Sequence, residues 1–173
     1  MNKIKSTVIV AAVIASALPA MAQRKSPHET ISAEIDGAKI TIAYGRPYAK
    51  QRKIWGGLVP YGEAWRTGAD EATLLTIDKA IVLGGTTLPA GKYSLYTLPA
   101  EGSAKLIVNK QTGQWGTVYQ EKEDLARIDM KKEALDKPVE QFTMEVAKSP
   151  SGGGVLKLKW EDREYSVPFM VEK

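Results

Sequence analysis

The chain has 173 residues, with 24 Lys and Arg against 20 Asp and Glu, no cysteine and one histidine. The lack of cysteine excludes disulfides, thiolate metal sites, a cysteine nucleophile and a lipid anchor attached to cysteine. A single histidine excludes zinc sites built on two or three imidazoles. We therefore expect no metal and no cofactor, and a fold whose stability comes from its hydrophobic core.

The first 22 residues have the features of a signal peptide. Two lysines precede an apolar run of about 11 residues at 8–18, and Ala-Met-Ala at 20–22 forms a small-residue cleavage site. This run is too short to span a membrane, because a transmembrane helix needs roughly 20 residues. The sequence predicts export to the periplasm or the extracellular space, with cleavage after Ala22.

Removal of 22 of the 173 residues would leave a mature chain of 151, from Gln23 onward. The two lysines of the signal leave with it, so the formal net charge falls from +4 to +2. A charge this small, without a stripe of Lys and Arg, argues against nucleic-acid binding. The rest of the chain has no run that could span a membrane. This length favours one domain at 23–173.

An antiparallel hairpin is predicted near the start of the mature chain. Apolar and polar residues alternate on both sides of Asp36-Gly37, a pair that a two-residue type I′ turn prefers. With this turn, the apolar pairs on one face are Ile31–Ile42, Ala33–Ile40 and Ile35–Ala38. A shift of one residue would expose half of them, so the turn and the pattern predict the same register.

Further short strands are predicted through the middle of the chain, separated by turns that contain Gly and Pro. Their ranges are 73–78, 79–83, 92–98 and 104–109. Residues 121–135 fit either a helical stripe or a strand, and we favour a strand over about 126–134. No amphipathic helix of ten or more residues lies between strands, which argues against a βαβ fold.

A second hairpin is predicted at the C-terminus, with a two-residue turn at Asp162-Arg163. Its alternating residues place Leu156, Leu158, Trp160, Tyr165, Val167 and Phe169 on one face, which assigns Trp160 to the core. Pro168 has no backbone N–H to donate, which suggests that the last strand is an edge strand. Taken together, the pattern predicts an all-β fold, an antiparallel two-layer β-sandwich of jelly-roll-like type with about nine or ten strands.

Residues 45–72 interrupt the strand pattern. A connection of this length inside a domain is usually functional or disordered. The segment contains two tryptophans, two tyrosines and several aliphatic residues, a composition that is not typical of disorder. We therefore expect one long ordered loop that covers one end or face of the sandwich.

Several motifs resemble one bacterial family. They are Gly45-Arg46-Pro47, KIWGGLVPYG at 53–62, WRTGADEAT at 65–73, LPAGKYSL at 88–95 and NKQTGQWG at 109–116. On these motifs the chain is similar to the family called domain of unknown function 2911 (DUF2911), over nearly the whole mature chain. The resemblance implies a secreted, β-rich protein. It provides no catalytic residues, because no activity is established for the family.

The long loop also concentrates the candidate binding residues. The predicted ligand-binding set is Arg46, Trp55, Tyr61, Trp65, Arg66, Asp70 and Glu71. Arginine beside acids and indole rings suits a small polar ligand, such as an anion or a carbohydrate. The alternative for Arg66 is an internal salt bridge to Asp70 or Glu71 that fixes the loop.

Two other functions stay open, a carboxylate-dependent hydrolase and a structural envelope protein. A glycoside-type hydrolase needs two carboxylates about 5–10 Å apart, and the candidates are Glu63, Asp70 and Glu71. Neighbours on a strand point to opposite faces, so Asp70 and Glu71 would not form such a pair if they lay in a strand, whereas Glu63 with either of them stays possible. His28 is interpreted as a surface or capping residue, because no G-x-S-x-G motif accompanies it. The sequence favours binding over catalysis, and it specifies neither the ligand nor the oligomeric state.

Overall fold

The computed structural model describes residues 26–172, so the predicted signal peptide lies outside the described residues. The regular structure of this range is all-β apart from one turn of 3-10 helix, η1. The elements are β1 (His28–Ile35), β2 (Ala38–Gly45), β3 (Thr73–Ile77), β4 (Ile81–Leu83), β5 (Thr86–Leu88), β6 (Gly91–Pro99), β7 (Ala104–Asn109), η1 (Glu121–Glu123), β8 (Asp124–Lys148) and β9 (Gly154–Val171). In this range no helix has the length and hydrophobicity to cross a bilayer.

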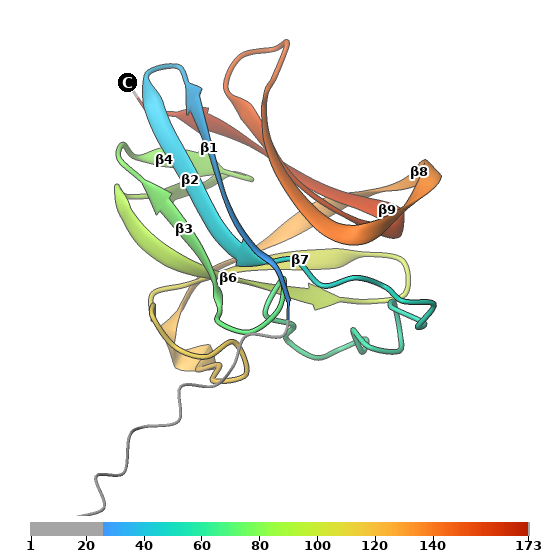
Figure 1. Cartoon of the computed structure of the whole chain (residues 1–173). Coiled ribbons are helices and arrows are strands. Elements are labelled where there is room, and N and C mark those ends of the chain that lie inside the picture. The colour runs from blue at the N-terminus through green and yellow to red at the C-terminus, as the bar shows by residue number, and fades with distance from the viewer. Residues whose placement is uncertain (1–25, 173) are drawn as a thin grey trace, which may run out of the picture.

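All strand pairs are antiparallel, and the strands form one sheet in the order β1-β2-β3-β6-β7-β8-β9-β4-β5. Most neighbours in the sheet are also neighbours in sequence. The exception is the β4–β5 hairpin, which leaves its sequence neighbours β3 and β6 and pairs with β9 at the far end of the sheet (Figure 1). The predicted antiparallel all-β fold is confirmed.

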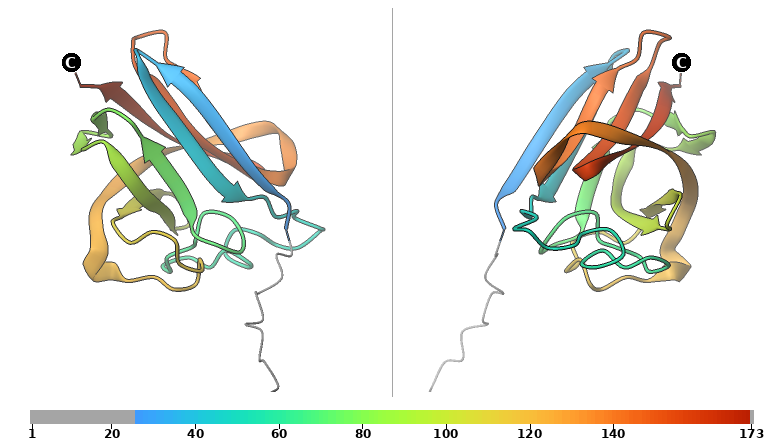
Figure 2. Two further views of the ribbon diagram at one scale, coloured as in Figure 1. Left: turned by 60° about the vertical axis from the view of Figure 1, so that its left-hand side comes forward. Right: turned by 90° about the vertical axis from the view of Figure 1, so that its right-hand side faces the viewer.

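The sheet bends so that its two halves pack against each other. In Figure 2, β1 and β2 run alongside β8 and β9. Ile42 of β2, Leu75 of β3 and Leu156 of β9 surround the same small internal space. One hydrophobic core contains residues from both halves. This arrangement is consistent with the expected sandwich, whose two layers are then two parts of one continuous sheet.

The first hairpin has the predicted register. Ile35 pairs with Ala38, and Asp36 and Gly37 at the turn have φ of 48° and 78°, as a type I′ turn requires. The turn also contacts the other half of the sheet, because Asp36 Oδ2 accepts a hydrogen bond of 2.9 Å from the backbone N–H of Gly153.

The predicted C-terminal hairpin is wrong, because β9 is one continuous strand. Its partner β8 is long enough to pair with both ends of β9, so no turn is needed. At the expected turn the strand bends instead, with φ of 50° at Glu161, and β8 has extra residues between Ala134 and Val139. The predicted inward face is nevertheless correct, since Trp160 and Tyr165 are both buried.

The edge position predicted for the last strand is also wrong. β9 lies between β8 and β4, and the two edges of the sheet are β1 and β5. Pro168 is tolerated because it falls between the two ladders: the pairing with β8 ends at Ser166, and the pairing with β4 begins at Phe169. The ambiguous region at 121–135 forms η1 and the start of β8, which confirms the preference for a strand there.

Candidate functional site

Residues 45–72 form an ordered loop between β2 and β3, as predicted. Backbone hydrogen bonds fix it to distant strands: Ala49 N–H donates to Glu140 O at 2.8 Å, and Trp65 exchanges two 2.8 Å bonds with Thr97. Bonds of this kind hold irregular backbone in a defined path, since they satisfy its polar groups. The loop crosses one end of the sheet (Figure 1). Its side chains are therefore presented on a rigid support.

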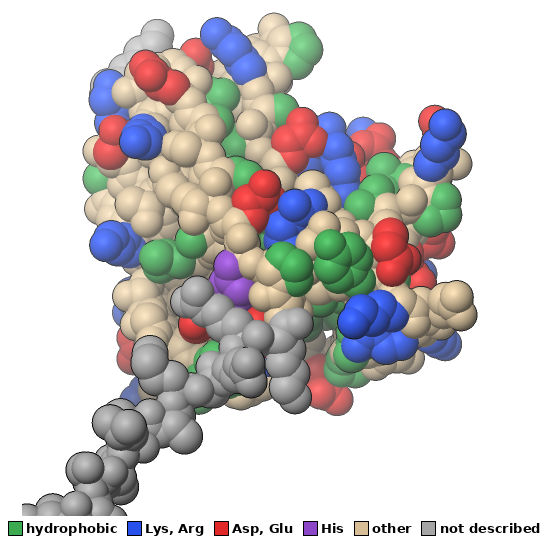
Figure 3. Space-filling view, in the orientation of Figure 1, with side chains coloured by type: hydrophobic (Ala, Val, Ile, Leu, Met, Phe, Trp, Pro, Cys, Tyr) green, Lys and Arg blue, Asp and Glu red, His purple; other side chains and the backbone are tan. Residues whose placement is uncertain are grey.

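A cavity of about 440 Å³ lies between this loop and the loop at 110–123. Its described lining residues are Ser26, Pro47, Arg52, Leu58, Pro60, Glu63, Ala64, Trp65, Arg66, Gly68, Ala69, Asp70, Gly116, Thr117 and Trp160. The volume is in the range of cavities that hold small organic ligands. Figure 3 shows acidic, basic and hydrophobic side chains close together on the lower right of the molecule, where Figure 1 places the long loop.

The apolar wall of this cavity is a pair of indole rings, of which Trp65 is partly exposed and Trp160, only 1% exposed, supports it. Trp65 stacks on Trp160 with ring centroids 5.7 Å apart and an interplanar angle of 20°. Phe142 meets both rings edge-on, at 5.0 Å from Trp65 and 5.7 Å from Trp160. Such stacked and edge-to-face contacts fix the ring planes. The wall is therefore preorganised for a flat or apolar part of a ligand.

Arg66 contributes a cation with few partners to this cavity. The residue is half-buried, and its only hydrogen bond to the described part of the chain is a long one, 3.4 Å from Nε to the carbonyl of Gly68. It makes no ion pair with any residue between 26 and 172, so the predicted alternative of a salt bridge to Asp70 or Glu71 is not formed. A guanidinium presents five donors, so most of its capacity is available to a ligand.

Two further charged side chains line the same cavity. Arg52 donates from Nε to Ala49 O at 3.0 Å and from Nη2 to Tyr48 O at 2.5 Å, so its bonds go to backbone carbonyls and not to a carboxylate. Glu63 is exposed, and it forms no hydrogen bond or ion pair with the described part of the chain. The cavity therefore carries charges of both signs that the fold itself does not neutralise.

Asp70 and Glu71 do not lie in a regular strand, so the divergence expected of neighbours on a strand does not apply to them. Asp70 lies before β3, with φ of 66°, and is only 5% exposed. Its Oδ2 accepts a hydrogen bond from Ser26 N–H at 3.3 Å and lies 3.1 Å from His28 Nε2. Glu71 Oε2 lies 3.5 Å from the same nitrogen. Because the pair precedes the strand, both carboxylates reach one imidazole instead of opposite faces of a sheet.

A second, smaller cavity of about 180 Å³ lies on the other side of this cluster. Glu71 and His28 line it, together with Gln114 from the 110–123 loop. Asp70 faces the large cavity and Glu71 faces the small one, so the imidazole of His28 connects their walls. His28, which the sequence predicts to be a surface or capping residue, is exposed, and it is also part of the site's framework. Residues 26–172 contain no group of three or more His, Asp or Glu with the arrangement of a metal site.

Four of the predicted binding residues do not line the large cavity, and one of them, Glu71, lines the small cavity instead. Trp55 is 4% exposed and packs edge-on against Trp65 and Tyr165, so it belongs to the core beneath the wall. The hydroxyl of Tyr61 accepts a 3.1 Å hydrogen bond from Arg163. Trp55 and Tyr61 therefore anchor the loop to the rest of the protein and do not face the large cavity.

Arg46 is the fourth. Its guanidinium donates to Phe142 O at 3.2 Å and to Thr143 Oγ1 at 2.8 Å, and it pairs with Glu29 at 3.1 Å. It therefore joins the first hairpin to β8. The structure brings Trp65, Arg66, Glu63 and Asp70 together in one cavity and places Arg46, Trp55, Tyr61 and Glu71 outside it.

Sequence reasoning missed Arg52, Trp160 and the Gly116-Thr117 pair. Trp160 was correctly placed in the core, but the same ring also faces the cavity where β9 bends. Gly116 and Thr117 come from a loop that is distant in sequence. The only available signal was the composition of the Thr112 to Gly116 turn, which combines glycine with tryptophan.

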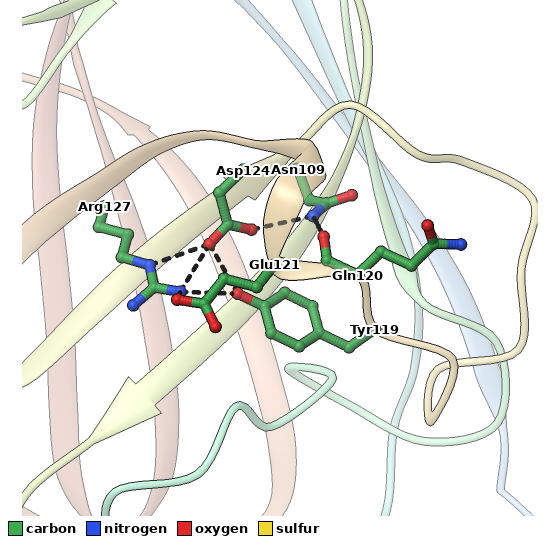
Figure 4. A network of polar contacts seen from close by, with 6 residues as sticks. All are labelled: Asn109, Tyr119, Gln120, Glu121, Asp124 and Arg127. Atoms are coloured by element: carbon green, nitrogen blue, oxygen red, sulfur yellow. Dashed lines mark hydrogen bonds and ion pairs between the residues drawn. The ribbon is translucent and has the colours of Figure 1, made fainter.

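A polar network at the base of the 110–123 loop holds it in place (Figure 4). Asn109 is fully buried and donates from Nδ2 to Gln120 O and to Asp124 Oδ1, both at 2.9 Å. Asp124 Oδ2 accepts from Tyr119 OH at 2.6 Å and from Arg127 Nε at 2.9 Å. Burial and the bond to Asp124 raise the pKa of Tyr119 to about 12. The network fixes both ends of the loop that supplies Gly116 and Thr117.

Comparison with known proteins agrees with the motifs. Searches of curated proteins and of solved structures found no match. The model of one family, described as a protein of unknown function (DUF2911), matches residues 26–169. This match spans nearly the whole described chain, from the start of β1 to the last residues of β9, and it includes both loops that line the cavity. The chain therefore belongs to the DUF2911 family.

Proposed function

We propose that this protein binds a small polar ligand with a negatively charged group in the 440 Å³ cavity. The observation that carries the proposal is the half-buried Arg66, whose guanidinium faces the cavity without a carboxylate partner in the described chain. A carbohydrate that carries an acidic group is one ligand of this kind. The indole pair would contact its apolar face, as indole rings do in sugar sites.

The energetic argument concerns the cost of an unpaired charge. Removing a charged group from water without a compensating partner is costly. The fold accepts this cost at Arg66 although Asp70 lies only four positions away in the sequence. A ligand carboxylate, sulfate or phosphate would form charge-assisted hydrogen bonds with the guanidinium, in a bidentate geometry that arginine favours. A loop with a purely structural role would not need an arginine without a carboxylate partner, so Arg66 favours a binding function.

We further propose that binding takes place outside the cytoplasm. The motivation is the predicted signal peptide at 1–22, with a mature chain that starts at Gln23. N-terminal sequencing of the protein from the periplasmic and culture fractions of an expressing bacterium would test it. A start at Gln23 in either fraction supports export. Full-length chain in the cytoplasm alone contradicts it.

A thermal-shift screen of the mature protein against carboxylates, sulfated sugars and uronic acids tests the binding proposal. A ligand at 100 times its dissociation constant stabilises the native state by about 2.7 kcal/mol. Arg66→Gln should abolish this shift, while Lys79→Gln, which removes an exposed positive charge, should not. The proposal fails if no anion stabilises the protein, or if Arg66→Gln responds like the parent chain.

A second candidate function is carboxylate-dependent hydrolysis, because Glu63 and Asp70 line the same cavity. Two carboxylates across a glycosidic bond can act as acid and as base or nucleophile. The engagement of Asp70 by His28 and Ser26 leaves Glu63 as the group with free access to a substrate. Hydrolysis of aryl glycosides that is lost in Glu63→Gln would support this function. Turnover that is unchanged in Glu63→Gln and in Asp70→Asn would exclude it.

A further inference from the structure

The charges at the large cavity are of both signs. Arg52 and Arg66 are cationic, and Glu63 and Asp70 are anionic. Asp70 is held by His28 and by the backbone of Ser26, whereas Glu63 has no partner within residues 26–172. Arg66 likewise has no carboxylate partner there. Arg52 also lacks a carboxylate partner there, but its guanidinium donates to the backbone carbonyls of Ala49 and Tyr48. The two charged side chains that the described fold engages least are thus one cation, Arg66, and one anion, Glu63.

These two side chains are close enough for one small molecule to reach both. They are three positions apart, so their Cα atoms are separated by at most about 11 Å. They do not pair with each other, although they line the same cavity. A ligand that carries only a negative charge would satisfy Arg66 and would be repelled by Glu63. A neutral sugar would compensate neither charge. A ligand with both charges compensates both.

The remaining lining is apolar. Besides the Trp65–Trp160 pair, it includes Pro47, Pro60 and Leu58, and the last of these is 46% exposed at the rim. Exposed leucine and indole surface gains free energy when an apolar group covers it. The ligand should therefore carry an apolar side chain in addition to its two charges.

We propose that the cavity takes a zwitterion with an apolar side chain, namely an α-amino acid or a short peptide with both termini free. This proposal rests on the function proposed above and narrows its ligand. The carboxylate lies on Arg66, the ammonium group lies on Glu63, and the side chain lies against the indole pair. A free amino acid and a short peptide share this chemistry and differ in the distance between their charges.

Calorimetric titration of the mature protein, residues 23–173, tests the proposal. The probes are L-phenylalanine, its N-acetyl derivative, which keeps only the negative charge, and its amide, which keeps only the positive charge. L-Alanyl-L-phenylalanine separates the peptide from the free amino acid, and glucuronate represents an acidic sugar. A zwitterionic probe should bind at least about tenfold more tightly than either singly charged derivative, because each charged contact contributes that much or more.

Two variants test which side chain contacts which charge of the ligand. Arg66→Gln should weaken binding of the zwitterion about tenfold or more and leave binding of the amide unchanged. Glu63→Gln should weaken binding of the zwitterion and not that of the N-acetyl form. The matched controls are Lys79→Gln and Glu34→Gln, which remove exposed charges elsewhere on the surface and should change neither affinity.

The outcomes separate the two proposals. If glucuronate or N-acetylphenylalanine binds as tightly as the zwitterions, the ligand is a simple anion: the inference fails and the proposed function stands. If the zwitterions bind and Arg66→Gln has no effect on them, the cavity is not their site, and the inference fails. If no probe binds and the anion screen is also negative, both proposals fail.

Discussion

A β-carbon on Gly116 would lie 2.3 Å from Cδ of Arg66 and 2.8 Å from its Cβ. The stem of the arginine therefore packs directly on the backbone of the 110–123 loop. The same β-carbon would lie 2.8 Å from the carbonyl oxygen of Asp70. Real β-carbons essentially never make non-bonded contacts this short, so the absence of a side chain at 116 allows the arginine stem to lie where it does.

Gly116→Ala is expected to displace Arg66 and to weaken ligand binding. Inserting a methyl group into a packed site typically costs about 1–3 kcal/mol, because neighbours must shift. We expect the free energy of unfolding to fall by this amount in urea denaturation, and the affinity for the ligand to fall in calorimetry. Gly102→Ala is the control, since nothing lies within 4 Å of a β-carbon there. Equal stability and affinity in both variants would show that the packing does not orient the arginine.

Asn109→Ala is expected to loosen the loop that carries Gly116. The Asn109 side chain makes two donor bonds and accepts one from Gln111 N–H, all at 2.9 Å. Each lost bond at a buried site costs about 1 kcal/mol, so the total loss of stability is about 3 kcal/mol. Hydrogen exchange of residues 110–123 should accelerate more than exchange in β2 and β3.

The adjacent Lys110 is exposed and provides the control for this experiment. Lys110→Ala should leave both the exchange rates and the unfolding midpoint unchanged. If Asn109→Ala accelerates exchange uniformly across the protein, the network contributes only to global stability. The view that it holds this loop in position would then be wrong.

The first hairpin was predictable because two local signals agree. Asp36-Gly37 specifies the turn, and the alternation from Ile31 to Ile42 specifies the same register. At the C-terminus only the alternation was informative. It gave the correct inward face, but Glu161 to Arg163 bend the strand without reversing it, because β8 continues alongside as a partner. A single sequence does not reveal the length of a partner strand.

The candidate site was also only partly predictable, because it too depends on segments that are distant in sequence. Composition identified the long loop, and four of its candidates, Glu63, Trp65, Arg66 and Asp70, do line one cavity. Which loop residues face the cavity and which face the core depends on contacts with distant segments. Trp55 faces inward because its indole N–H donates to Trp160 O at 3.3 Å, and Arg46 is engaged by β8. Neither contact leaves a local signal, because each joins segments about 100 residues apart.

Stability should decline at alkaline pH through two buried hydroxyls. Burial raises the pKa of Tyr44 to about 12, and burial together with the bond to Asp124 does the same for Tyr119. The unfolded chain loses these protons near pH 10, whereas the native state keeps them to about pH 12. The unfolded state therefore binds fewer protons in this window, so the contribution is complete below pH 10 and is lost as the pH rises toward 12.

Urea denaturation between pH 8 and pH 12 measures this effect. Tyr44→Phe and Tyr119→Phe should each reduce the slope of unfolding free energy against pH above about pH 10. Tyr44→Phe should in addition lower stability at pH 8 by about 1–3 kcal/mol, because the Met144 N–H that donates to the Tyr44 hydroxyl at 3.0 Å loses its acceptor. The exposed Tyr48 is the control, and Tyr48→Phe should leave the slope intact.

The contact between the first hairpin and the β8–β9 turn should depend on Gly153. A β-carbon at this position would lie 2.1 Å from the carbonyl oxygen of Phe169, in a backbone conformation with φ of 64°. The neighbouring Gly152 also has positive φ, 94°, but its β-carbon would make only an ordinary contact of 3.6 Å with Met170. Comparing alanine substitutions at the two glycines therefore separates the cost of a left-handed backbone from the cost of a steric clash.

Gly152→Ala should cost about 1–2 kcal/mol from the left-handed conformation alone. Gly153→Ala should cost about 1–3 kcal/mol more, because the turn must move away from β9 and Asp36 then loses the Gly153 N–H. Urea denaturation gives the two stabilities, and hydrogen exchange at Gly153 and Ala38 reports the loss of the contact. If Gly153→Ala is no worse than Gly152→Ala, the turn can move without cost, and its hydrogen bond to Asp36 does not hold the two halves of the sheet together.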